Sequence, residues 1–144
     1  MADLLDLEKW CLDLPDRIEA GANELAKTVI RAIDVDLVEH TPVDTTEAVS
    51  NWQPGVAAAP DFPLPPIVPG VRGSTAPHSR AEAIAHVERA LEDKDPGVSF
   101  YLTNVAEHIG LLNDGTSKQE PAGFVERGIR KGELAAEAAG LEVL

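Results

Sequence analysis

The chain has 144 residues, a length that suits a single domain able to bury about two thirds of its unfolded surface. Twelve Lys and Arg residues stand against twenty-five Asp and Glu residues, so the formal net charge is -13. This acidic balance excludes nucleic acid and anionic membrane as direct ligands, because a basic excess is needed to neutralise phosphates. The single cysteine, Cys11, excludes both an internal disulfide and a thiolate cluster for structural zinc.

The first predicted element is a long helix. An N-terminal helical segment, residues 1 to 14, precedes it, and Pro15 then suits the first turn, where its missing N–H costs nothing. The helix should end near His40, because Pro42 disfavours helical backbone at Thr41. Its buried face is predicted from apolar residues at steps of three and four: Ile18, Ala22, Leu25, Val29 and Ile33.

A short strand and a proline-rich arm follow the helix. Alternation over residues 49 to 53 predicts a strand that ends at Pro54. Seven of the eleven prolines then lie between residues 54 and 77, so residues 55 to 77 are predicted to be an extended arm or a long loop. Its apolar side chains, Phe62 and Leu64 among them, favour an arm that is mobile in the free subunit and settles on a neighbour.

The second half of the chain predicts two more helices around a second strand. Ser79 and Glu82 resemble a capping box, which starts a helix whose apolar stripe contains Val87. Residues 98 to 103 alternate as a half-buried strand, and a short helical turn then stops at Gly115. The terminal helix is predicted to open at Pro121 and run to about Glu137. The fold class is therefore α+β, with a long N-terminal helix and two further helices packed on a small antiparallel sheet.

No stretch of the chain predicts catalysis or metal binding. The four histidines (His40, His78, His86 and His108) fall in four different elements, without metal-ligand spacing. Ser117, His108 and Asp114 would make a triad on paper, yet no nucleophile-elbow pattern surrounds the serine. Trp10 and Trp52 are interpreted as core anchors. We therefore expect no enzyme activity, no cofactor and no metal.

Two stretches in a fixed order resemble a known family. "TPVDTTEAVSNW", directly after the long helix, and "YLTNVAEHIGLLNDGTSKQEPAGFVERGI" resemble the two signatures of the neck or tail-component (tail completion) proteins of tailed bacteriophages. The chain departs from that family at Thr46, where glycine is usual, and at Asn113 and Asp114, where Glu-Tyr or Glu-Phe is common. The matching motif residues are Thr41, Pro42, Val43, Asp44, Thr45, Trp52, Asn104, Gly115, Thr116, Ser117, Pro121, Gly123 and Phe124.

The resemblance implies a structural, non-enzymatic protein of the phage neck. Its partners would be further copies of itself in a ring, the neighbouring head-tail connector and the tail terminator or tail tube proteins. DNA would pass through the channel only as cargo, no membrane would be involved, and the protein would reside in the virion after assembly in the host cytoplasm. Residues 116 to 120 would then face a neighbouring subunit, with a plain surface turn as the next alternative. The competing class is a small enzyme, or a prophage-encoded ligand-binding or host-interaction module.

Overall fold

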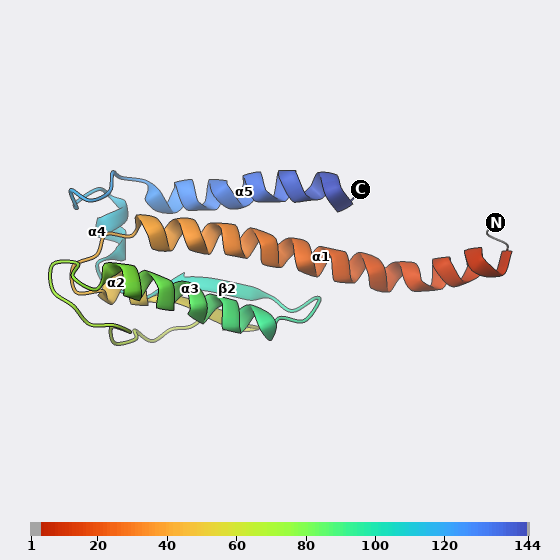
Figure 1. Cartoon of the computed structure of the whole chain (residues 1–144), viewed down its shortest axis with the longest axis horizontal. Helices are drawn as coiled ribbons and strands as arrows, with labels where there is room; N and C mark the ends of the chain where they lie inside the picture. The colour runs from red at the N-terminus through yellow and green to blue at the C-terminus, as the bar shows by residue number, and fades with distance from the viewer. Residues whose placement is uncertain (1–3, 144) are drawn as a thin grey trace.

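The computed structural model describes residues 4 to 143 as helices flanking a two-stranded sheet. Helix α5 lies along one side of the long helix α1, while α3 and the sheet lie along the other side (Figure 1). The predicted α+β class is confirmed. Within the described range, no helix is long and apolar enough to span a bilayer. The elements are α1 (Leu4–His40), α2 (Glu47–Ser50), β1 (Trp52–Val56), α3 (Ala76–Glu92), β2 (Phe100–Asn104), α4 (Ile109–Asn113) and α5 (Phe124–Val143).

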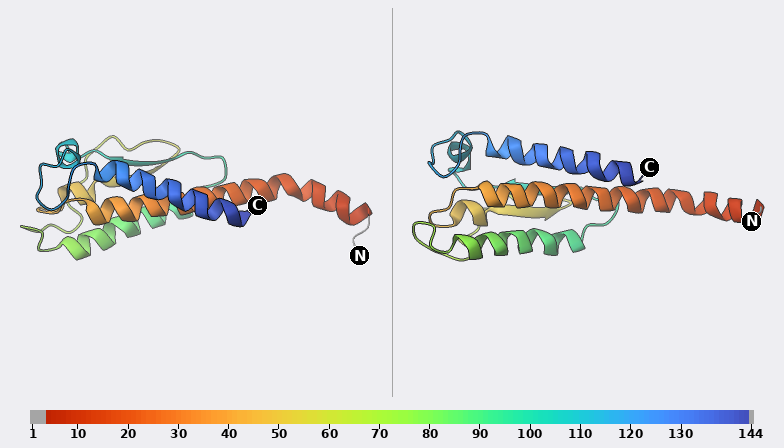
Figure 2. Two further views of the ribbon diagram at one scale, coloured as in Figure 1. Left: turned by 90° about the horizontal axis from the view of Figure 1, so that it is seen from above. Right: turned by 45° about the horizontal axis from the view of Figure 1, so that its top comes forward.

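Helix α1 is one continuous element, so the prediction that Pro15 begins a new helix is wrong. Pro15 lies inside α1, where it supplies no N–H for the helical ladder. The helix axis changes direction in its N-terminal part (Figure 2), as expected where a proline interrupts the bonding pattern. The C-terminal end agrees with the prediction, since α1 stops at His40 just before Pro42.

Helix α5 packs closely on α1 because two glycines leave room for the side chains of α1. A Cβ added to Gly128 would press on Leu37, and one added to Gly132 would press on Ile33 and Val29. Small residues spaced by four on one helix face allow the two backbones to approach each other. The C-terminal half of the predicted apolar face of α1 therefore packs against α5.

The sheet is an antiparallel pair of β1 and β2, which α3 separates in the chain, and it differs in detail from the sequence prediction. Residues 47 to 50 form the short helix α2, and β1 begins only at Trp52. The strand then runs through Pro54, which pairs with Leu102. With only two strands both are edge strands, so a residue without an N–H is tolerated here.

The proline-rich segment is a long loop, as one of the two expected forms, and it is held against its own chain. The buried amide of Asn51 pairs with the backbone of Leu64 in both directions, at 2.8 Å from the Leu64 N–H and 3.0 Å to its carbonyl. Gln53 Nε2 donates to the carbonyl of Phe62 at 2.8 Å, and Ser50 Oγ accepts from Ile67 N at 2.9 Å. Side chains of the α2–β1 turn therefore replace the backbone partners that a segment without secondary structure lacks.

Helix α3 begins earlier than the capping box predicted. It starts at Ala76, with Pro77 in its first turn, so Ser79 lies inside the helix. The buried Ser79 hydroxyl donates to the carbonyl of Val68, 2.9 Å away, and thereby ties α3 to the proline-rich loop. Arg80 lies next to it and donates to the carbonyls of Val38 and Thr41, both at 3.2 Å, where α1 needs partners for its terminal carbonyls.

The core lies between the C-terminal half of α1, the two-stranded sheet, α3 and the start of α5. Trp52 is 5% exposed and is a core anchor as predicted. Trp10 is 49% exposed, so its interpretation as a core anchor is wrong. The core cluster consists of Leu37, Val38, Val43, Val49, Trp52, Ala83 and Phe124.

One carboxylic acid is buried in this packing. Asp34 on α1 is 1% exposed, and its Oδ1 atom has no hydrogen-bond partner. Burial, and secondarily the negative charge of Glu88 on α3, raise the pKa of Asp34 from 3.8 to about 7. The α1–α3 packing therefore favours the neutral acid over the carboxylate.

The close approach of α5 to α1 predicts the effect of a single added methyl group. Gly132→Ala should lower the free energy of unfolding by about 1–2 kcal/mol, because overpacking costs about 1–3 kcal/mol and the better helix propensity of alanine offsets only part. Gly140→Ala is the matched control, since nothing lies within 4 Å of a Cβ placed there. It should be neutral or slightly stabilising in urea denaturation. Equal effects at both positions would contradict the close packing.

The buried Asp34 predicts a pH dependence of stability. Below pH 3.8 the carboxyl is protonated in both states, and between pH 3.8 and 7 only the unfolded chain releases the proton, so stability falls as pH rises. At pH 8, Asp34→Asn should therefore have a higher free energy of unfolding than the native chain. The upper limit of this gain is about 1.4 kcal/mol for each unit by which the Asp34 pKa is raised. At pH 4 the gain should vanish. Chemical denaturation across this range, with the exposed Asp13→Asn as control, measures it; a gain independent of pH would refute the assignment.

Candidate functional site

The two motif stretches, far apart in the sequence, meet at the end of the molecule where α1 stops. Between them lies an open hollow of about 310 Å³. The turn between α1 and α2, residues 42 to 48, forms one wall, and four residues around α4 form the other: His108, Leu112, Ser117 and Gln119. Asp44 and Thr45 are exposed at the rim, whereas Pro42 and Val43 are buried beneath it.

Thr41 joins the end of α1 to the start of the sheet. Its buried hydroxyl donates to the carbonyl of Leu37 at 2.6 Å and accepts the Trp52 indole N–H at 2.8 Å. A buried indole N–H without an acceptor would lower the stability of the fold. The bond to Thr41 therefore satisfies the Trp52 N–H and also fixes the orientation of the ring. The angle between α1 and strand β1 therefore depends on the bond between Thr41 and Trp52, two residues of the same motif.

Asp44 holds the far end of the proline-rich loop. Its carboxylate accepts from the backbone N–H of Arg72 at 2.7 Å, and its own carbonyl accepts from Gly73 N at 2.9 Å. Both loop residues have positive φ, 54° at Arg72 and 72° at Gly73, so a tight turn is fixed at this point. The motif aspartate thus orders a segment 28 residues away.

Gln119 connects the second motif to the first. Its side-chain amide accepts from Val43 N at 2.9 Å and donates to Val43 O at 3.1 Å, which imitates the pairing of a neighbouring strand. Ser117 Oγ accepts from Gln119 N at 3.1 Å and so orients the loop that carries the amide. The hollow is consequently closed on one side by a hydrogen-bonded bridge between the two motifs.

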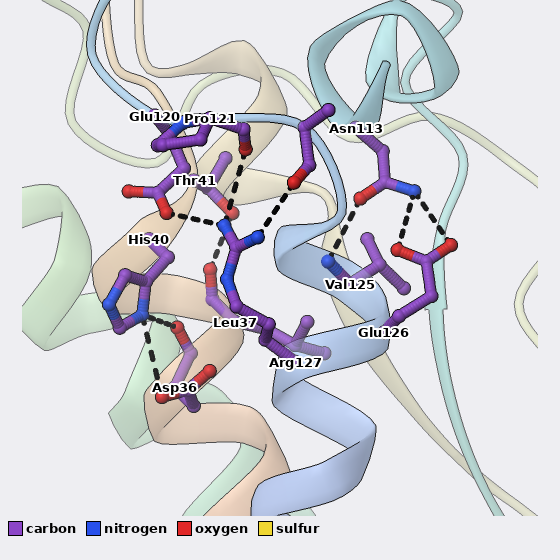
Figure 3. A network of polar contacts seen from close by, with 11 residues as sticks. Asp36, Leu37, His40, Thr41, Asn113, Glu120, Pro121, Val125, Glu126 and Arg127 are labelled. Atoms are coloured by element: carbon purple, nitrogen blue, oxygen red, sulfur yellow. Dashed lines mark hydrogen bonds and ion pairs between the residues drawn. The ribbon is translucent and has the colours of Figure 1, made fainter. Parts of the chain in front are cut away.

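The loop from α4 to α5 is built around Asn113. Gly115 ends α4 with a φ of 88°, as predicted. Helix α5 starts at Phe124, three residues after the expected start at Pro121. The reason is a cap supplied from outside the helix, because Asn113 Oδ1 accepts from Val125 N at 2.9 Å and Asn113 O accepts from Gly123 N at 2.7 Å (Figure 3).

Charged groups complete this cap. Glu126, in the first turn of α5, accepts two bonds of 3.0 Å from the amide of Asn113. Hydrogen bonds from its own backbone N–H and from Asn113 lower the pKa of the Glu126 carboxyl. Arg127 folds back over the loop, where it meets Glu120 at 2.7 Å and the carbonyl of Ala122 at 2.6 Å (Figure 3). The loop therefore presents a fixed shape to its surroundings.

The remaining motif residues serve the packing around the site. Asn104, at the end of β2, donates to the carbonyl of Ala48 at 2.8 Å and so ties the sheet to α2. Phe124 is fully buried in the core, and Gly123 has the positive φ, 85°, that the entry into α5 requires. Thr116 bonds the carbonyl of Leu111 at 2.9 Å and remains exposed on the loop.

Three contributors were missed from the sequence: Gln119, Arg127 and Arg80. Asn113 was expected only to favour a turn and to depart from the family pattern. An asparagine eleven residues before a helix start has no local capping signature, and glutamine or arginine side chains reach partners that sequence spacing does not reveal. Only Asn113 gave a usable signal, since asparagine favours a turn.

The geometry offers little acid–base or metal chemistry. His108 and Ser117 both line the hollow, yet no hydrogen bond joins Ser117 to His108 or Asp114 among residues 4 to 143. In that same part of the chain, no three His, Cys, Asp or Glu side chains gather in a way that suits a metal ion. The site consists of a shaped, hydrogen-bonded surface.

Comparison with known proteins leaves the family open. No protein-family model, curated protein or solved structure matches this chain.

Thr46 provides a direct test of the motif turn. It has a φ of 74°, in the left-handed region that penalises a branched side chain, and it is the position where glycine is usual in the resembling family. Its hydroxyl also donates to Val68 O at 3.0 Å. Both Thr46→Gly and Thr46→Ala lose this bond, but only glycine relieves the backbone. Thr46→Gly should therefore exceed Thr46→Ala in stability by about 1 kcal/mol in urea denaturation. An alanine variant at least as stable as glycine would contradict the strained turn.

Proposed function

We propose that this chain is a structural subunit of the head-to-tail connection of a tailed bacteriophage, in the neck or at tail completion. It would assemble as part of a ring around the DNA channel and join the head connector to the tail. One observation carries the proposal: the two stretches that resemble the phage family pack against each other and form one rigid end, linked by Val43 and Gln119. A fixed end of this kind suits a repeated protein contact.

Charge and shape support the same role. The net charge of -13 disfavours grip on DNA, and a channel that DNA must traverse requires slippage. The exposed rim residues Asp44, Thr45 and Thr116 would contact a second copy in the ring or the neighbouring connector and tail proteins. The protein would be non-enzymatic, would need no cofactor, and would reside in the virion after assembly in the host cytoplasm.

A second candidate function rests on the hollow itself. Its volume of about 310 Å³ is at the small end of ligand pockets, and its lining mixes polar side chains with Val43 and Leu112. A small ligand-binding or host-interaction module encoded on a prophage would use such a hollow without any structural role. Phage particles that join heads and tails normally in the absence of the protein would favour this alternative and overturn the connector role.

The test is complementation of a phage that lacks this gene, with Asp44→Ala as the variant. The loss of the bond to Arg72 N should cost about 1 kcal/mol of stability. We expect a larger loss of function, at least tenfold in plaque titre, with unjoined heads and tails in electron micrographs, because a small tilt repeated around a ring prevents closure.

A matched control separates assembly from stability. Asn23→Ala removes the bonds between Asn23 and the buried Lys94, at the other end of the α1–α3 packing, so its stability loss should be at least as large. Titre should nevertheless stay within severalfold of the native protein. Equal titre losses for the two variants would mean that the motif end has no special role.

A further inference from the structure

The N-terminal third of α1 extends past the rest of the molecule (Figure 1). Apart from the half-buried Leu14, every side chain described between residues 6 and 20 is exposed. Several of these side chains are large and apolar: Leu7 is 54% exposed, Trp10 49% and Ile18 62%. We call residues 6 to 25 the overhang: they comprise this exposed extension and the next turns of α1, where the buried Asn23 joins the domain through Lys94. An exposed apolar helix face of this length is typical of a surface that another protein covers.

The overhang is costly as a free helix. Pro15 removes one helical hydrogen bond and clashes with the preceding turn, which destabilises a helix interior. Helices in proteins gain most of their stability from packing one apolar face, and the side chains described from residue 6 to residue 20 are exposed except for the half-buried Leu14. A partner surface is therefore needed to keep this segment helical.

The apolar positions of the overhang follow the spacing of a helix that pairs with another helix. They recur at alternating steps of four and three residues over nearly three heptads, the pattern of a coiled-coil seam. Four of them line an open groove of about 570 Å³ together with Trp10, Arg17 and Ala22, and the missing side chain of Gly21 leaves a hollow there between the larger Ile18 and Leu25. The seam residues are Leu7, Cys11, Leu14, Ile18, Gly21 and Leu25.

We propose that the same segment of a second copy of this chain covers the overhang, in antiparallel orientation. With the pairing centred near residue 16, Leu7 meets Leu25 of the partner subunit and Leu14 meets Ile18 of the partner subunit. Trp10 and Cys11 then lie against the hollow at Gly21 of the partner subunit. A parallel pair in register would place Gly21 against itself and leave that level of the seam empty, so the sizes of the side chains favour the antiparallel pair.

The charges of the overhang are compatible with this pairing. All the charged side chains of the overhang, most of them negative, occupy heptad positions outside the seam, so no carboxylate is buried when the seam closes, and Arg17 lines the groove beside it. Because most of these charges are negative, two overhangs repel each other weakly through solvent, and added salt should strengthen the pair. This inference does not depend on the proposed phage role, and the failure of either leaves the other intact.

Disulfide trapping of the full chain distinguishes the possible orientations. In Gly21→Cys, the antiparallel pair places Cys11 against the introduced cysteine of the partner subunit, so mild oxidation should give mostly covalent dimer. Native Cys11 alone should give little covalent dimer. Cys11→Ser combined with Gly21→Cys should give equally little, because position 21 does not face itself. Efficient trapping of the native chain through Cys11 would show a parallel pair and overturn the proposal.

Sedimentation equilibrium tests the pairing without chemistry. The native chain should dimerise, and the dissociation constant should fall as salt rises from 50 to 500 mM. Ile18→Asp should weaken dimerisation at least 100-fold, whereas Leu12→Asp, 73% exposed and outside the seam, should leave it within threefold. Both variants should keep the native unfolding midpoint as monomers, because neither side chain packs on the domain. A monomeric native chain at 100 μM, or equal losses in both variants, would refute the pair.

Discussion

The hydroxyl group of Thr41 links the two halves of this fold. It closes the last turn of α1 through Leu37 O and receives the indole N–H of Trp52, so the helix end and the first strand share one buried polar atom. Trp52 in turn fills the core beside Val38 and Phe124. A threonine is well suited to this position, because a hydroxyl can donate to one group and accept from another. Valine would keep the shape but leave the indole unsatisfied.

The parts of the fold that follow from local rules were predictable from the sequence. The end of α1 at His40 follows from Pro42. Strand β2 follows from the alternation around Phe100, and the end of α4 follows from Gly115. The errors arose where long-range partners outweigh local preference. Pro15 remains inside a helix, and α5 starts at Phe124, after Pro121, because Asn113 caps it from outside the helix.

The sequence identified the motif residues of the candidate site. It did not predict how their side chains are arranged in space. Three side-chain amides, those of Asn51, Gln119 and Asn113, bond backbone groups 12 to 76 residues away. Each replaces a strand or cap partner that the local chain does not supply. Amides are versatile because they donate and accept at once, and no sequence spacing reports which distant backbone they will meet. The resemblance singled out both stretches in the sequence, while their contact and the bonds between them emerged only from the folded chain.

Helix α1 lies between two layers, α5 on one side and α3 with the sheet on the other, and the two layers are held to it by different contacts. Helix α5 rests on α1 along the grooves made by Gly128 and Gly132 and is fastened at its start by Asn113. The sheet and α3 lie on the other side of α1 (Figure 2), where the bond from Ser79 to Val68 O ties α3 to the proline-rich loop. We therefore expect α5 to open first in its C-terminal turns, where no residue described between 133 and 140 is buried, and to stay closed at Phe124, which is fully buried in the core shared with the other layer.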